Sequence, residues 1–132
     1  MEKLYFKNKI VCIIIRKSFK TDGIKFFTPS DFSMQMGYMK RPKNYFIKPH
    51  YHKSIEKKVT DIKEILFIKK GKIKVYFYTK SGKKISNKIL KKGDLILLAN
   101  YAHGFKMLEE SILLEVKQGP YLIENDKIHI NK

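Results

Sequence analysis

Short alternating or apolar segments separated by turn residues constrain the fold of this chain more than any other feature. In residues 73–78, Ile73, Val75 and Phe77 alternate with Lys and Tyr side chains, which is the two-residue period of a half-buried β-strand. Turn signals recur at intervals of about eight to twelve residues, and they include Asp22-Gly23, Lys70-Gly71, Ser81-Gly82 and Gly93-Asp94. No stretch sustains a helical period. The pattern therefore predicts an all-β sandwich or barrel.

We expect one domain over residues 1–132, in which strands within 1–30 precede the main sheet-forming segments. Residues 53–61 are polar and are expected to form an exposed hairpin arm. The glycines at Gly71 and Gly93 are expected to occupy turns that need a positive φ. The predicted strands are 4–6, 10–15, 24–27, 32–38, 45–52, 64–68, 73–78, 85–90, 95–99, 103–107 and 111–117.

Composition narrows the class of protein. Hydrophobic residues make up 43% of the chain, enough for a packed core rather than a disordered chain. Cys12 is the only cysteine, which excludes an internal disulfide and a cysteine-based zinc site, and we expect it to be a core residue. The apolar run 10–15 is closed by Arg16 and Lys17, and it is too short for a membrane span or a signal peptide. A cytoplasmic protein with no membrane partner is expected.

The formal net charge of +17 raises the question of a polyanionic partner. Arginine occurs only at Arg16 and Arg41, and the lysines are scattered through every segment. Specific readers of nucleic acid rely on arginine, and non-specific ones cluster their charge. We therefore interpret the lysines mainly as a solvated surface and rank nucleic-acid binding last. The alternative is a local positive rim that steers a phosphorylated or nucleotide-linked substrate.

His50 and His52 are the first candidate ligands for a metal ion. On a β-strand, residues two apart project from the same face, so both imidazoles could bind one ion. Imidazole nitrogen is the commonest protein ligand for first-row divalent metals. A third histidine, His103, and the carboxylate of Glu64 would complete an N/O site with open positions. The sequence thus predicts a metal site of His50, His52, Glu64 and His103.

These residues resemble the two motifs of the cupin family. His50-Tyr51-His52 with Glu64 and Gly71 is similar to the first motif, and Gly93-Asp94 with His103 is similar to the second. The resemblance covers residues 32–117. It implies a cupin-type jelly roll, or double-stranded β-helix, whose barrel mouth holds a divalent metal on His50, His52, Glu64 and His103. Eleven residues separate His52 from Glu64, more than in the family pattern, so Glu64 is expected either as a ligand or as a base.

The residues 117–121 are similar to the ending of small cupins found among surface-polysaccharide and nucleotide-sugar genes. That resemblance implies a protein that acts on a sugar or nucleotide sugar as an isomerase or epimerase. A homodimer is also expected, from exposed edge strands and because cupins commonly bury the hydrophobic outer face of one sheet between two copies. Glu64 or Tyr101 would serve as the catalytic base. Two alternatives use the same fold: an iron-dependent dioxygenase, and a non-catalytic protein that binds a small molecule. The ligand set accepts iron, manganese, nickel or zinc.

Overall fold

All regular structure in the computed structural model is β, over the residues that it describes, 1–120 and 127–130. These residues contain no helix, which confirms the all-β class, and accordingly none of them belongs to a helix able to cross a bilayer. The chain divides into two compact units. Residues 20–61 form the smaller unit, and residues 1–19 together with 62–132 form the larger one.

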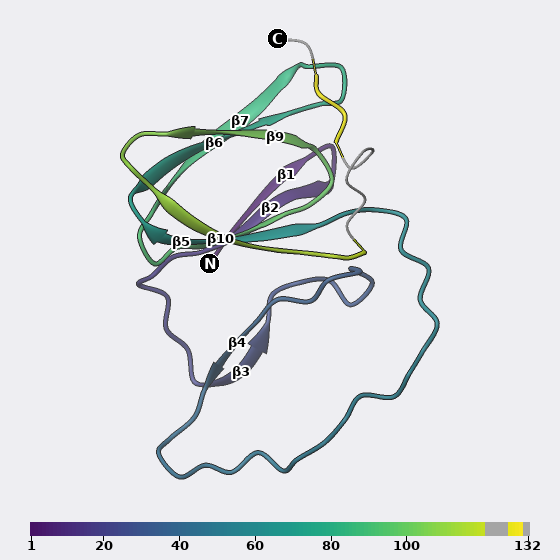
Figure 1. Ribbon diagram of the computed structural model, residues 1–132, viewed down its shortest axis with the longest axis vertical. Helices are drawn as coiled ribbons and strands as arrows, with labels where there is room; N and C mark the ends of the chain where they lie inside the picture. The colour runs from purple at the N-terminus through teal and green to yellow at the C-terminus, as the bar shows by residue number, and fades with distance from the viewer. Residues whose placement is uncertain (121–126, 131–132) are drawn as a thin grey trace. The chain divides into compact units, whose positions relative to one another are not determined.

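The larger unit consists of two antiparallel sheets (Figure 1). The five-stranded sheet has the order β1-β2-β8-β5-β10, and the three-stranded sheet has the order β7-β6-β9. Within the described part of the chain they remain two sheets and do not close into one barrel. The strands are β1 (Glu2–Phe6), β2 (Lys9–Ile15), β5 (Glu64–Lys70), β6 (Lys72–Tyr78), β7 (Lys84–Lys91), β8 (Leu95–Leu98), β9 (Ala102–Met107) and β10 (Ile112–Lys117).

The core of this unit lies between the inner faces of the two sheets. Ile73, Val75 and Phe77 of β6 are each at most 1% exposed, as their alternation predicts. They belong to one apolar cluster with side chains from β2, β5, β7 and β8, so both sheets contribute to it. Cys12 is a buried member, and burial raises the pKa of its thiol to about 12. Its expected role as a core residue is confirmed.

Two glycines make the tight turns at one end of the unit. Gly71 joins β5 to β6 with φ +88°, and Gly93 lies between β7 and β8 with φ +90°. Residues with a Cβ rarely adopt this conformation. A Cβ on Gly71 would also overlap the Glu110 carbonyl oxygen and the Ser111 side chain. The expectation of positive φ at both positions is confirmed.

The smaller unit contains one hairpin, in which β3 (Gly23–Phe26) pairs antiparallel with β4 (Gly37–Lys40). The prediction of a strand over 32–38 was wrong for residues 32–36. The backbone there binds side chains instead: the Met36 amide donates to Thr28 Oγ1 at 3.2 Å, and the Phe32 carbonyl accepts from Gln35 Nε2 at 3.0 Å. Such local bonds compete with pairing between strands.

Residues 45–61 run as an exposed, irregular segment. The strand predicted over 45–52, which was to carry His50 and His52, and the hairpin arm predicted over 53–61 were both wrong, although the exposure of the arm is confirmed. Pro49 has no amide hydrogen to donate to a neighbouring strand. At the start of the segment, the Tyr45 amide donates to the Pro42 carbonyl at 3.2 Å in a turn.

Candidate functional site

Glu64 and His103 meet at one end of the larger unit, although they belong to different sheets. Glu64 is the first residue of β5, and it shares the inner face with Leu66 and Ile68. His103 is the second residue of β9. Glu64 Oε2 lies 3.1 Å from His103 Nε2, and the two side chains are 13% and 26% exposed. Two of the four predicted metal ligands are therefore in direct contact.

The environment of Glu64 keeps its carboxyl group ionised. The hydrogen bond from His103 lowers the pKa of Glu64, and its effect exceeds the opposing effect of burial. The positive charges of Lys117 and Lys127 lower this pKa further. His103 Nδ1 is buried and has no hydrogen-bond partner in the described ranges, 1–120 and 127–130. Unpaired buried nitrogens are uncommon, and they are often found where a site serves a purpose other than stability.

These two side chains line a hollow of about 560 Å³, which we call the His103 hollow. The register explains why its residues converge: Glu64 pairs with Leu98 and Tyr78 pairs with Ala102, so the beginnings of β5 and β9 and the ends of β6 and β8 lie there. Aromatic rings of Tyr78, Tyr101 and Phe105 complete much of its wall. Aromatic walls with a few convergent polar groups are typical of small-molecule sites.

Tyr101, the second predicted catalytic residue, lies in this wall. Its hydroxyl donates to the Phe6 carbonyl at 2.8 Å, and its ring packs edge-on against the Phe6 ring with centroids 5.6 Å apart. Tyr101 thus fastens the loop before β9 to the end of β1. Because its proton is held by a carbonyl oxygen, Tyr101 is less suited than Glu64 to take a proton from a ligand.

His50 and His52 belong to the smaller unit. They do not share a strand, but their rings lie side by side with centroids 5.4 Å apart, and His50 Nδ1 is 2.9 Å from the Lys48 carbonyl oxygen. Both side chains are exposed. The four predicted ligands thus form two pairs, one in each unit. Among the described residues, no three His, Cys, Asp or Glu side chains form a group that could hold a metal ion.

His129 also lines the His103 hollow, although neither of the two motifs includes it. Its side chain is exposed. Lys127, which acts on the pKa of Glu64, reaches the hollow from the same segment. No motif spacing in the sequence connects Lys127 and His129 with Glu64 or His103. These residues lie together only because of the three-dimensional path of the chain. Tyr121, part of the ending that resembles small cupins, lies outside the described residues.

Comparison with known proteins does not assign the chain to a family. No protein-family model matches the chain, and neither a curated protein nor a solved structure does.

Proposed function

We propose that this chain is a cupin-like cytoplasmic protein that binds a sugar or nucleotide sugar in the His103 hollow and isomerises or epimerises it. The single observation that carries the proposal is the contact between Glu64 and His103 in an aromatic-walled hollow. A carboxylate and an imidazole in contact are groups that commonly move protons in enzymes. A single, buried Cys12 suits a reducing compartment. The jelly-roll topology is part of the proposal, supported by the motifs and by two facing antiparallel sheets.

The two side chains have complementary roles in this reaction. The ligand's carbonyl oxygen replaces Glu64 as the acceptor of the hydrogen bond from His103 Nε2–H, which then stabilises the enediolate. Ionised Glu64, released from that bond, takes the proton from the carbon beside the carbonyl group. Return of the proton to the former carbonyl carbon, together with transfer of the adjacent hydroxyl proton to the former carbonyl oxygen, yields the isomer. Return of the proton to the opposite face of the original carbon yields the epimer. The lowered pKa keeps Glu64 ready to accept the proton at neutral pH.

Metal binding is the second element of the proposal. Two imidazoles with centroids 5.4 Å apart, at His50 and His52, and the carboxylate–imidazole pair of Glu64 and His103 are donors that iron, manganese, nickel and zinc accept. An ion held by Glu64 and His103 would polarise the carbonyl group of a ligand in the His103 hollow. If Glu64 is itself a ligand, it is not free to act as the base. An iron-dependent dioxygenase would use the same donors.

A non-catalytic binding protein is the second candidate. It is favoured because both candidate bases already form hydrogen bonds within the protein: Glu64 with His103, and the Tyr101 hydroxyl with the Phe6 carbonyl. In that case the polar groups of the His103 hollow would fix a ligand's orientation only.

Proton exchange separates these candidates. Untagged protein is incubated with nucleotide sugars in heavy water, and NMR follows exchange at the carbon beside the carbonyl. We expect exchange that falls about 10²- to 10⁴-fold in Glu64→Gln, and that persists in Glu110→Gln, a control whose side chain is 88% exposed. Binding without exchange supports the second candidate. If the protein shows no binding and no exchange, the proposal is overturned.

Metal analysis is a separate arm. Elemental analysis of the untagged protein is expected to find an ion that is lost in His50→Gln/His52→Gln. A metal content that is unchanged in this variant would remove both histidines from the ligand set.

A further inference from the structure

A second hollow, of about 820 Å³, lies at the opposite end of the strands from the His103 hollow. Strand β6 relates the two, because Lys72 at its start lines the second hollow and Tyr78 at its end lines the first. The length of this strand separates them by about 20 Å. The wall of the second hollow carries five cationic side chains, and we call it the basic hollow: Arg16, Lys17, Lys72, Lys91 and Lys92.

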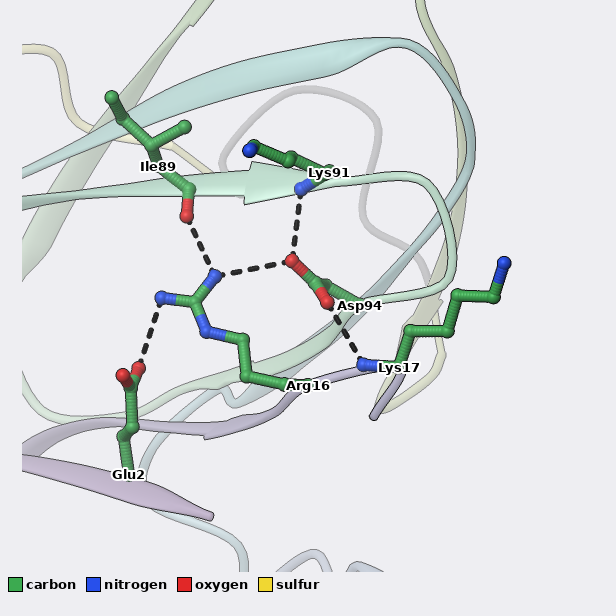
Figure 2. Close-up of polar contacts among 6 residues, drawn as sticks. All are labelled: Glu2, Arg16, Lys17, Ile89, Lys91 and Asp94. Atoms are coloured by element: carbon green, nitrogen blue, oxygen red, sulfur yellow. Dashed lines mark hydrogen bonds and ion pairs between the residues drawn. The ribbon is translucent and has the colours of Figure 1, made fainter. Parts of the chain in front are cut away.

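Asp94 is the fixed centre beneath these cations. It is 6% exposed, and its carboxylate accepts hydrogen bonds from the Lys17 amide at 2.9 Å, the Lys91 amide at 2.9 Å and Arg16 Nη1 at 3.1 Å (Figure 2). Arg16 also donates to the Ile89 carbonyl at 2.7 Å and pairs with Glu2 at 3.0 Å. The network ties the end of β2 to the turn between β7 and β8, so the backbone that carries the lysines is held in place.

The four lysines, by contrast, have no acidic partner. None of the ammonium groups of Lys17, Lys72, Lys91 and Lys92 forms an ion pair with a carboxylate of residues 1–120 or 127–130. Arg16 is already matched by Asp94 and Glu2. The basic hollow therefore carries an excess of positive charge that the described chain does not neutralise.

Two structural features place these lysine side chains close together despite the repulsion between their charges. Lys72 is the direct cross-strand partner of Lys91 in the pairing of β6 with β7, and like charges at such positions destabilise a sheet. Lys17 is held by Gly93: a Cβ at Gly93 would lie 2.7 Å from Lys17 Cδ, so the lysine stem packs where only a glycine leaves room. A multivalent anion in the basic hollow would replace this repulsion with attraction.

We propose that the basic hollow binds a small molecule with a diphosphate or longer phosphate chain. Lysine ammonium groups bind phosphate as compact point charges, and several of them around one hollow match two or more adjacent phosphate groups better than one. The volume admits a compact ligand such as a nucleoside diphosphate. The site is separate from the His103 hollow and does not depend on the function proposed there.

Titration calorimetry tests the proposal with pyrophosphate, orthophosphate and a short DNA duplex as probes. Two variants with equal net charge are compared. Lys72→Gln/Lys91→Gln/Lys92→Gln removes cations from the basic hollow, and Lys80→Gln/Lys83→Gln/Lys84→Gln removes exposed cations near the turn between β6 and β7. We expect pyrophosphate to bind more tightly than orthophosphate. Its affinity should fall at least about tenfold in the first variant and less than about twofold in the second.

Lysine acetylation followed by mass spectrometry tests the same site without any substitution. Pyrophosphate is expected to protect Lys17, Lys72, Lys91 and Lys92 and to leave Lys80, Lys83 and Lys84 as reactive as before. Protection of both sets, equal loss of affinity in the two variants, or no pyrophosphate binding by the unaltered protein would overturn the proposal. So would DNA that binds more tightly than pyrophosphate and displaces it, since the surface would then serve a nucleic acid.

Discussion

Glu64 Oε2 on β5 and His103 Nε2 on β9 lie 3.1 Å apart and connect the two sheets of the larger unit at one end. Their strands are not neighbours in either sheet, so no backbone ladder holds them together. The pair therefore contributes to stability through a charge-assisted hydrogen bond, and the same bond sets the ionisation of a group that lines the His103 hollow. Stability and ligand chemistry are coupled at this one contact.

The stability contributed by Glu64 is expected to depend on pH. Its pKa is lowered in the folded protein, so its contribution is fully present above its unfolded pKa of about 4.3 and is lost as the pH falls through the folded pKa. At pH 7, Glu64→Gln should lower the free energy of unfolding by about 1–3 kcal/mol. Urea denaturation at several pH values measures the difference, which should shrink towards low pH. A difference that is constant with pH would contradict this assignment, and Glu110→Gln serves as the exposed control.

Asp94→Asn is expected to be among the more damaging single substitutions in the chain. The carboxylate accepts three hydrogen bonds while almost fully buried, and an amide would turn an NH₂ group towards one of those donors. We expect a loss of about 2–4 kcal/mol in the free energy of unfolding. Asp22→Asn is the matched control, because Asp22 is 92% exposed and its pair with Lys40 should be worth less than about 1 kcal/mol. Similar losses in both variants would show that the buried network is not what matters.

Gly71→Ala and Gly104→Ala form a second matched pair. Gly71 has φ +88° and no space for a Cβ, whereas a Cβ on Gly104 would meet nothing within 4 Å. We expect Gly71→Ala to cost about 2 kcal/mol or more, while Gly104→Ala, within strand β9, should be neutral or stabilise by about 0.5–1 kcal/mol. Thermal and urea unfolding of the two variants compare these values directly. Equal effects would mean that the Gly71 turn is not under the constraint described.

The sequence predicted strands well where a strand has a core on one side and a neighbour to pair with. The alternation of Ile73, Val75 and Phe77 reports burial directly, because each of these side chains reaches the core. Over 32–36 the burial alternates as the pattern predicts, but these residues do not form a strand. Over 45–52 the apolar residues misled, since Phe46 is 73% exposed and Tyr51 is 90% exposed. A periodic pattern records which side chains are apolar, and it carries no information on whether another strand lies beside them.

The candidate site was predictable only in part, for the same reason. The motif resemblance singled out both Glu64 and His103, which are in contact. The basic hollow could not be seen in the sequence, where its lysines look scattered. It arises because the β6–β7 register places Lys72 opposite Lys91 and because the Asp94 network brings Lys17 to the same turn. Register and turn geometry depend on tertiary contacts that no local pattern encodes.

The outer face of β10 leads us to expect a homodimer. β10 is an edge strand of the five-stranded sheet, and its Ile112, Leu114 and Val116 side chains are 45%, 52% and 58% exposed on one face. Phe67 of the neighbouring strand β5 is 38% exposed. An exposed edge with an apolar face favours association, and a second copy can cover it symmetrically.

Light scattering after size exclusion should give twice the mass of the chain. Leu114→Lys should weaken the dimer at least about tenfold, whereas Met107→Lys, at a 47% exposed position on the other sheet, should leave it intact. A monomer at every concentration, or equal weakening by both substitutions, would remove β10 as the interface.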